Sequence, residues 1–239
     1  MGSAVVKPKR DSKPPGEDVR LEICEVFESI AGESTLAGLP AIFVRLTGCN
    51  LRCSWCDTRY ALDPGTSLSI SQIVELTTTR RSALVVVTGG EPLLQSGTPS
   101  LCKALLAKHK RVQVETNGSL DIACLPPPVQ VVLDMKAPSS GACDLMDFGN
   151  LARLKPGDDL KIVLSDRADF DWAARLVSGS SLPAGVSVLL SPVADLLAPA
   201  SLAEWLLDSG LQARIQIQLH RFLWPDGLEG RPIPIRQTP

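Results

Sequence analysis

The sequence lacks a run of about 18 apolar residues, so it has no segment of the length that a transmembrane helix requires. It also lacks an excess of charge of either sign, since 24 lysines and arginines stand against 26 aspartates and glutamates, for a net charge of -2. A near-neutral chain offers no broad basic surface to nucleic acid or to an anionic membrane. These absences favour a small-molecule ligand or a protein partner, with no nucleic acid and no membrane.

Histidine is scarce, with two residues, and the seven cysteines are an odd number with three clustered together. This pattern argues against a secreted disulfide framework and predicts a reducing, cytoplasmic location. The N-terminus also lacks the apolar core of a secretory signal peptide. Cys24, Cys102 and Cys124 lie in apolar stretches and are predicted to be ordinary buried thiols, and the sequence assigns no role to Cys143.

The chain of 239 residues is 44% hydrophobic, which is enough for one sizeable α/β core. Residues 1–18 are rich in lysine, proline and glycine, and we predict a disordered N-terminal tail there and one domain over 19–239. Short apolar segments in that domain read as strands. The predicted strands are Leu21–Phe27, Ala41–Leu46, Ala83–Thr88, Arg111–Glu115, Val129–Asp134, Leu160–Leu164, Gly185–Leu190 and Ala213–Leu219.

Amphipathic helices are expected between these strands. Ser69 with Gln72, and Ser201 with Glu204, have the spacing of a capping box at a helix start. Apolar residues at intervals of three and four also predict helices over Ser100–His109 and Asp169–Val177. The alternation predicts a parallel sheet, which is either an open doubly wound sheet or a barrel.

Polar motifs follow the predicted strands, and in both architectures ligands bind at the carboxyl ends of the strands. We therefore expect the ends of six strands to contribute to one site. The segments concerned are the cysteine loop after Leu46, Thr88-Gly89-Gly90-Glu91-Pro92, Glu115-Thr116-Asn117-Gly118, Asp134-Met135-Lys136, Ser191-Pro192 and His220.

Three cysteines, Cys49, Cys53 and Cys56, have the spacing C-x3-C-x2-C. Thiolates hold iron–sulfur clusters, and a cubane normally takes four of them. Three close thiolates without a fourth leave one iron open to another ligand. A structural zinc site is the alternative, but it usually needs a second cysteine or histidine pair.

This spacing resembles the signature of the radical S-adenosylmethionine (SAM) superfamily. The resemblance implies a partial, open parallel β/α barrel and a [4Fe-4S] cluster held by Cys49, Cys53 and Cys56. It also implies that the methionine end of SAM binds the fourth iron. Reductive cleavage of SAM then yields a 5′-deoxyadenosyl radical that abstracts hydrogen from the substrate.

The same resemblance assigns SAM contacts to three segments. Gly90 and Glu91 would bind the methionine amino group, although two glycines and an acid could simply form a strand-to-helix turn. Asp134 and Lys136 would point to the same side of a strand and reach the ribose and carboxylate, or could be plain surface residues. The complete set of cofactor contacts is Gly90, Glu91, Asp134, Met135, Lys136, Ser191, Pro192, Val193 and Ala194.

Further stretches resemble one family within that superfamily, the 7-carboxy-7-deazaguanine synthases. They are Glu25–Glu33, Gly38–Pro40, Phe43–Leu46, Cys56–Thr58 and Gln216–Trp224, within a resemblance that covers about residues 19–231. The family members are lyases that convert 6-carboxy-5,6,7,8-tetrahydropterin to 7-carboxy-7-deazaguanine and ammonia, in queuosine and 7-deazapurine biosynthesis. They require Mg²⁺ and regenerate SAM.

By position, the family resemblance implies a set of substrate and magnesium contacts. Arg45 would pair with the substrate carboxylate, although a structural acid could be its partner instead. Thr58 would give its hydroxyl to Mg²⁺, or could cap a loop, and His220 could be an ordinary strand-end histidine. The implied substrate contacts are Ile30, Ala31, Gly32, Glu33, Arg45, Thr88 and His220.

The family also implies a homodimer and an electron donor of the flavodoxin or ferredoxin type. Two alternatives stay open, a glycyl-radical enzyme activase and a structural zinc-binding protein. The sequence departs from the family where Gly32-Glu33-Ser34 replaces the common Gly-Glu-Gly. In some relatives the last residue contacts substrate, but no such role is assigned to Pro239.

Overall fold

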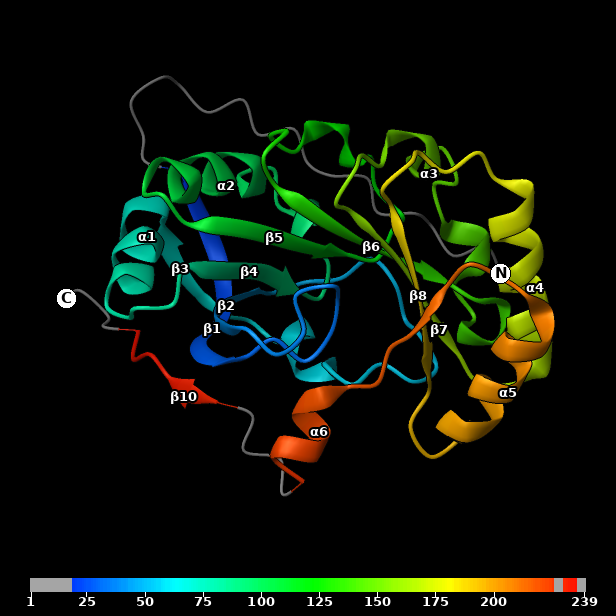
Figure 1. Cartoon of the computed structure of the whole chain (residues 1–239). Helices are drawn as coiled ribbons and strands as arrows, with labels where there is room; N and C mark the ends of the chain where they lie inside the picture. The colour runs from blue at the N-terminus through cyan, green and yellow to red at the C-terminus, as the bar shows by residue number, and fades with distance from the viewer. Residues whose placement is uncertain (1–18, 226–229, 236–239) are drawn as a thin grey trace, which may run out of the picture.

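The structure is a computed structural model that describes residues 19–225 and 230–235 (Figure 1). The predicted N-terminal tail of residues 1–18 and the terminal Pro239 lie outside the described residues. The described part of the predicted domain is built on a single sheet of ten strands.

Seven strands of this sheet run parallel to one another and follow the order of the chain. They are β2 (Pro40–Leu46), β4 (Leu84–Gly89), β5 (Arg111–Thr116), β6 (Gln130–Lys136), β7 (Asp159–Leu164), β8 (Ser187–Pro192) and β9 (Arg214–Ile215). A doubly wound sheet would reverse this order at a switch point, whereas a barrel winds in one direction. The order ends at β9 without pairing back to β10 in the described residues, so the predicted partial barrel is confirmed.

The first strand differs from the prediction of a parallel sheet. β1 (Arg20–Ile30) runs antiparallel to β2, and it also pairs antiparallel with β3 (Thr66–Ser69) and β10 (Arg231–Pro232). The connection from β1 to β2 covers only residues 31–39, and a parallel pair needs a crossover of a dozen or more residues. The short connection therefore enforces the antiparallel pairing.

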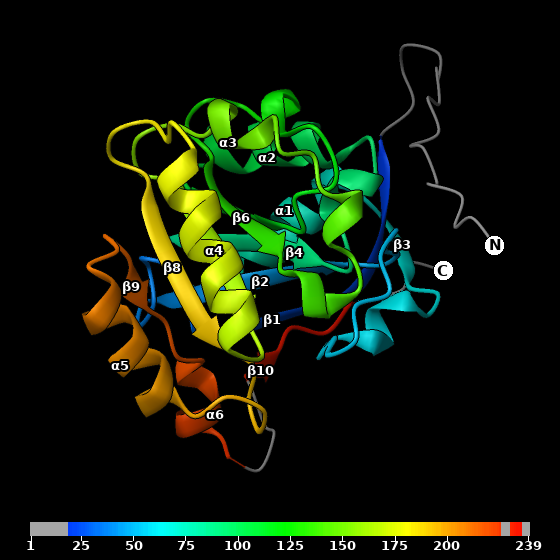
Figure 2. The same cartoon turned by 90° about the vertical axis from the view of Figure 1, so that its right-hand side faces the viewer.

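The helices cover the outer face of the curved sheet, with α1 and α2 over one half and α4 and α5 over the other (Figures 1 and 2). The α-helices are α1 (Ile70–Thr78), α2 (Thr98–Ala107), α3 (Asn150–Arg153), α4 (Arg167–Gly179), α5 (Pro199–Ser209) and α6 (Leu219–Leu223). The short 3-10 turns are η1 (Arg59–Leu62), η2 (Pro92–Leu94), η3 (Ile122–Cys124), η4 (Pro138–Ser140) and η5 (Cys143–Leu145). No helix of the described residues has the length and apolar character needed to cross a membrane.

One predicted capping box is confirmed and the other is wrong. Ser69 accepts a hydrogen bond from the Gln72 backbone N–H, and the Gln72 side chain accepts one from the Ser69 N–H. Ser201, in contrast, lies inside α5, which begins at Pro199 after Ala198. Proline is pre-organised for the first helical position, so it starts this helix two residues before the serine.

The last predicted strand, Ala213–Leu219, is also mostly wrong. Only Arg214 and Ile215 pair with β8, and Leu219 begins helix α6. Ile215 and Ile217 are exposed, so the alternating pattern here does not bury an apolar face. The Leu219 N–H donates to the Gly32 carbonyl at 3.0 Å, which draws the chain away from the sheet edge.

Of the three cysteines predicted to be buried thiols, Cys102 is fully buried and Cys24 is half-buried. The prediction for Cys124 is wrong, because its side chain is exposed. Cys124 ends the turn η3, which leads from β5 to β6, and its thiol donates to the Asp121 carbonyl at 3.4 Å. Apolar neighbours in sequence do not bury a side chain that lies on a surface turn.

The parallel strands present two different faces because successive side chains alternate between them. On β4, Val85 and Val87 join the large core beneath the helices, whereas Leu84 and Val86 join a small cluster on the opposite, inner face. Further along the strands the inner face becomes polar. Because the polar side chains of the inner face lie near the carboxyl ends of the strands, a ligand site is expected there.

Candidate active site at the carboxyl ends of the strands

The inner face of the sheet carries a row of polar side chains near the carboxyl ends. Arg45 on β2 is in register with Thr88 on β4, and Asp134 on β6 is in register with Lys161 on β7. Register partners in a sheet point to the same side, so these groups face one space. The expected convergence of the strand ends is therefore present for β2, β4 and β6, and Lys161 adds β7, which was not among the six predicted segments.

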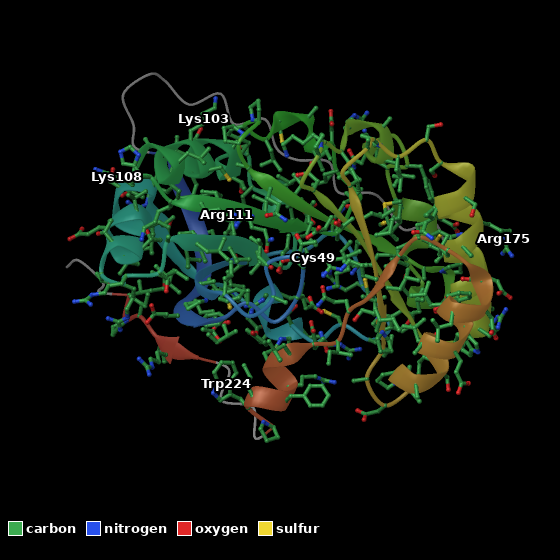
Figure 3. The ribbon with its side chains drawn as sticks, viewed as in Figure 1. Cys49, Lys103, Lys108, Arg111, Arg175 and Trp224 are labelled. Atoms are coloured by element: carbon green, nitrogen blue, oxygen red, sulfur yellow. The ribbon has the colours of Figure 1, made fainter. Side chains whose placement is uncertain are left out.

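The cysteine loop follows β2 and lies over this edge of the sheet (Figure 3). Cys49 and Cys53 are half-buried and Cys56 is exposed. The loop is anchored by the Gly48 N–H, which donates to the Ala61 carbonyl at 2.8 Å, and by the Ser54 N–H, which donates to the Ser140 carbonyl at 3.0 Å. Burial raises the pKa of the Cys49 and Cys53 thiols.

The Gly89-Gly90 turn after β4 packs directly against the cysteine loop. The Glu91 N–H donates to the Gly48 carbonyl at 2.8 Å. A Cβ atom on Gly90 would lie 2.3 Å from the Gly48 oxygen and 2.8 Å from the Cys49 Cβ, closer than any real side chain allows. Gly90 thus permits the approach of two loops that are both predicted to bind the cofactor.

Asn117, immediately after β5, is a site residue to which the sequence assigned no individual role. Its amide donates to the Cys49 sulfur at 3.7 Å and to the Asn50 side-chain oxygen at 3.1 Å. The Asn50 amide in turn donates to the Ser119 hydroxyl at 2.8 Å. This network holds Cys49 in place. The sequence feature that indicates a role for Asn117 is its position directly after a strand.

Glu91 is fully buried, and its carboxylate is occupied by groups of the chain itself. It accepts from the Asn117 N–H at 2.6 Å, the Thr116 hydroxyl at 2.8 Å and the Leu93 N–H at 2.9 Å. Burial raises the pKa of Glu91 to about 7, against the lowering effect of these hydrogen bonds. Glu91 thus ties the turn after β4 to the end of β5, and its contact with a cofactor amine stays a prediction.

Asp134, Lys136 and Lys161 form a group of charges in which Lys161 is buried and the other two are half-buried. The Asp134 Oδ2 lies 3.1 Å from the Lys136 ammonium and 3.4 Å from that of Lys161. Burial opposes ionisation of Asp134, but the two lysines lower its pKa below the ordinary value. Its other oxygen, Oδ1, is buried without a hydrogen-bond partner in the described residues. This orphaned acceptor fits a ligand that brings a hydroxyl donor.

The Met135 side chain, between these two residues, points the other way. It is fully buried in the core beneath the helices, so only its backbone can face a ligand.

Lys161 connects this group to the predicted substrate loop. Its ammonium lies 2.5 Å from the Glu33 Oε2, and the Gln218 amide donates to the Glu33 Oε1 at 3.1 Å. A Cβ atom on Gly32 would lie 2.0 Å from the His220 Nδ1, so the two residues are in tight contact. The structure thereby brings together Gly32, Glu33 and His220, which the sequence predicted to share one ligand. His220 occupies helix α6 rather than a strand end.

Lys161 was not among the predicted site residues. Arg45 was assigned through the family resemblance, and the stretches that carry this resemblance do not include Lys161. The sequence marks Lys161 as a lone cation between apolar neighbours, in Leu160-Lys161-Ile162.

Arg45 has a carboxylate partner within the chain. Its guanidinium Nε lies 2.8 Å from the Glu25 Oε1, which also accepts from the Tyr60 hydroxyl at 3.1 Å. The central carbon of the Arg45 guanidinium lies 5.7 Å from the centroid of each of the Phe27 and Tyr60 rings. A pairing with one Glu25 oxygen through Nε leaves the terminal guanidinium nitrogens as further donors.

Thr88 and Glu115 meet at the ends of β4 and β5, where the Thr88 hydroxyl donates to the Glu115 Oε2 at 2.9 Å. Burial, together with Glu33, raises the pKa of Glu115. The predicted substrate residues Ile30 and Ala31 are at the end of β1, where Ile30 is half-buried and Ala31 is buried. Thr88, Glu115 and Ile30 therefore belong to the strands that surround the inner face, and Ala31 follows β1 and packs in the small apolar cluster on that face.

The segment after β8 borders a pocket. Ser191 is buried, and the Val193 N–H donates to the Leu164 carbonyl at 2.8 Å. The pocket has a volume of about 250 Å³ and shares Pro192 and Ala194 with the predicted cofactor contacts. Its lining residues are Pro192, Ala194, Asp195, Leu197, Pro199, Ile217, Gln218, Arg221 and Phe222.

Thr58 lies beside the last cysteine, with its hydroxyl 3.9 Å from the Cys56 sulfur. It precedes the turn η1 but makes no side-chain capping hydrogen bond there. The loop-capping alternative for Thr58 is thus not what the structure shows, and its role as a ligand of a hard cation such as Mg²⁺ stays a prediction.

The donor set of the cysteine loop fits an iron–sulfur cluster. A cubane takes each thiolate on a separate iron, so its ligands need not converge on one point. In the described part of the chain, no three histidine, cysteine or acidic side chains are placed to hold a single metal ion. Asn117, which donates to the Cys49 sulfur, supplies the kind of hydrogen bond that tunes such a cluster.

Comparisons with known proteins agree with this geometry. The model of the radical SAM superfamily matches residues 43–134, which include the cysteine loop and Asp134. The 7-carboxy-7-deazaguanine synthase of Chlorobaculum tepidum is 43% identical over 86% of this chain and 96% of its own length. That of Koribacter versatilis is 37% identical over 88% of this chain and 100% of its own length.

A solved structure has the same fold. The crystal structure of QueE from Escherichia coli matches with a TM-score of 0.72 over 84% of this chain and 95% of that chain, at 22% identity.

Proposed function

This chain belongs to the 7-carboxy-7-deazaguanine synthase family of the radical SAM superfamily, and from that premise we propose that it converts 6-carboxy-5,6,7,8-tetrahydropterin to 7-carboxy-7-deazaguanine and ammonia. The observation that carries the proposal is the convergence of the cysteine loop, the Gly90 turn and the charged inner face at one edge of the sheet. The named relatives favour this activity over a glycyl-radical activase or a zinc-binding protein.

The cofactor side of the site is formed by the cysteine loop and the strand ends next to it. Cys49, Cys53 and Cys56 would hold a [4Fe-4S] cluster, which with SAM supplies a 5′-deoxyadenosyl radical. Asp134 would accept from the ribose through its orphaned Oδ1, and Lys136 would pair with the SAM carboxylate. The Pro192–Ala194 segment would line the nucleoside at the pocket edge.

The substrate side is formed by the loop after β1 and by the inner face of β2, β4 and β5. Glu33 presents a half-buried carboxylate that suits the N–H donors of a pterin edge. Arg45 would bind the substrate carboxylate with the donors that Glu25 does not use. Thr88 and His220 would hydrogen-bond the substrate from opposite sides of this space.

Mg²⁺, an electron donor and a partner subunit complete the proposal. Thr58, whose hydroxyl makes no cap, would be a magnesium ligand next to the cluster. An electron carrier of the flavodoxin or ferredoxin type, a homodimeric assembly and a cytoplasmic location rest on the family resemblance.

Anaerobic turnover tests the proposal. The reconstituted protein is incubated with the carboxytetrahydropterin, SAM, Mg²⁺ and dithionite, and the ultraviolet chromophore of 7-carboxy-7-deazaguanine is expected, with ammonia in equal amount. The Cys53→Ala variant is the negative control, and no product is expected from it. Pterin that stays unchanged in the presence of a fully loaded and reduced cluster would refute the proposed activity.

A further inference from the structure

Lys161 lies between two carboxylates that belong to the two halves of the proposed site. It is buried on β7, with its ammonium 2.5 Å from Glu33 and 3.4 Å from Asp134. Glu33 is on the substrate side and Asp134 on the SAM side. We propose that Lys161 is a positioning residue that couples SAM binding to substrate binding by exchanging its ion pair between Glu33 and Asp134. This inference rests on the proposed function.

Each of the two carboxylates has one further partner, and these partners differ in charge. Asp134 has a second cation, Lys136, at 3.1 Å, whereas the further partner of Glu33 among the described residues is the neutral Gln218 amide at 3.1 Å. Burial opposes the charge of Lys161, but Glu33 and Asp134 raise its pKa well above the ordinary value. Lys161 is therefore a permanent cation shared by two acids, and Glu33 depends on it more than Asp134 does.

The exchange follows from this imbalance. A ligand carboxylate that engages Lys136 removes a cation from Asp134, which leaves Lys161 as the cation nearest to that acid. When Lys161 moves toward Asp134, Glu33 loses its positive partner. A carboxylate that is largely shielded from water is destabilised when it loses its partner, so the half-buried Glu33 then binds the N–H donors of a pterin more strongly.

The coupling must also work in the other direction. Donors that engage Glu33 release Lys161 toward Asp134, which makes it easier for Lys136 to leave Asp134 for a ligand carboxylate. Binding free energies are linked reciprocally, so each ligand tightens the binding of the other by the same factor.

Equilibrium dialysis of SAM against the reconstituted protein with an oxidised cluster measures this factor without turnover. We expect the Kd of SAM to fall by at least about fivefold when 6-carboxy-5,6,7,8-tetrahydropterin is added to the wild type, the low end of typical coupling. In Lys161→Met, the Kd of SAM without the pterin divided by the Kd of SAM with it is expected to fall to about one. Iron content and circular dichroism establish that the variant is folded and loaded, and Lys161→Gln replaces it if Met is not tolerated.

Lys155→Met is the matched control. Lys155 makes an ion pair of 2.6 Å with the buried Asp158 just before β7, and it contacts neither Glu33 nor Asp134. It should therefore keep the wild-type ratio.

The outcomes separate this inference from the proposed function. If the wild type binds both ligands and the ratio is the same in the wild type and in the Lys161 variant, the role of Lys161 is refuted while the activity stands. The same holds if the wild type shows no coupling at all. If the wild type binds SAM but not the pterin, the proposed function fails and the inference fails with it.

Discussion

At the scale of single residues, the site depends on charged groups held on a largely apolar sheet. Arg45, Asp134 and Lys161 are each within strands whose neighbours in sequence are buried in the core. Isolated buried charges are costly, and here each has an opposite charge within 3.4 Å. Such pairs hold the side chains in place before a ligand arrives, which is the requirement for a site that must orient two ligands together.

Replacement of Arg45 by alanine tests the carboxylate contact. Arg45→Ala is expected to weaken binding of the carboxytetrahydropterin by about 1.5–3 kcal/mol, the typical value of a charge-assisted hydrogen bond. Equilibrium dialysis with the oxidised holoprotein measures this change. Arg111→Ala is the control, because Arg111 begins β5 at the opposite end of the strands from the cysteine loop (Figure 3). Unchanged affinity in Arg45→Ala would show that another group receives the carboxylate.

Glu91 predicts a pH dependence of stability. Folding raises its pKa from 4.5 to about 7, so between these values the folded chain holds a proton that the unfolded chain has lost. The free energy of unfolding is therefore not reduced by Glu91 at low pH, and it falls as the pH rises from about 4.5 to about 7. The expected loss is about 3 kcal/mol, at about 1.36 kcal/mol for each pKa unit. Urea unfolding of iron-free wild type and Glu91→Gln should show the wild type losing stability relative to the variant over this range. Parallel pH profiles would contradict the assignment.

At the scale of elements, two turns must approach each other closely. The Gly89-Gly90 turn after β4 rests on the backbone of the cysteine loop after β2, and the adjacency of these strands makes the contact possible. A glycine is needed at residue 90 because any side chain there would overlap with atoms of the cysteine loop.

Gly90→Ala is expected to force these turns apart. Its Cβ would meet the Gly48 oxygen at 2.3 Å, and overpacking of this kind costs about 1–3 kcal/mol. We expect a lower free energy of unfolding and a clear loss of iron after reconstitution. Gly179→Ala is the control, since a Cβ on Gly179, at the end of α4, meets nothing within 4 Å. Full iron loading in Gly90→Ala would mean that the loops tolerate separation.

At the scale of the whole molecule, the fold of the sheet does not depend on what the cysteine loop binds. The large core lies between the outer face of the sheet and the helices, and the loop lies over the edge of the sheet. Cys49 and Cys53 only pack against the margin of that core. The fold should therefore persist without the cluster.

Cys53→Ala tests this separation. The variant should lose its iron, from about four atoms per chain to near zero, because a cubane needs its thiolate ligands. Its far-UV circular dichroism spectrum should match that of the iron-free wild type. Cys124→Ala, which removes an exposed thiol on a surface turn, should keep the full iron content. Iron retained in Cys53→Ala would remove Cys53 from the ligand set.

Local patterns in the sequence were sufficient for many features of this protein. Apolar runs located the parallel strands, and Ser69 with Gln72 located the start of α1. The pattern failed for Ser201 and for Ala213–Leu219, where a proline and a contact with Gly32 decided the outcome. Both failures involve information that lies outside the short window in which the pattern was read.

By itself the sequence determined the cysteine spacing, the strand-end motifs and the alternation of strands and helices, because these depend on neighbours in the chain and on side-chain alternation. Only the tertiary structure decided that β1 runs antiparallel, that α6 replaces a strand, and that Lys161 meets Glu33, 128 residues away in the chain. Contacts of this kind depend on strand register across the whole sheet. A register is set by the packing of all strands together, and no short segment contains it.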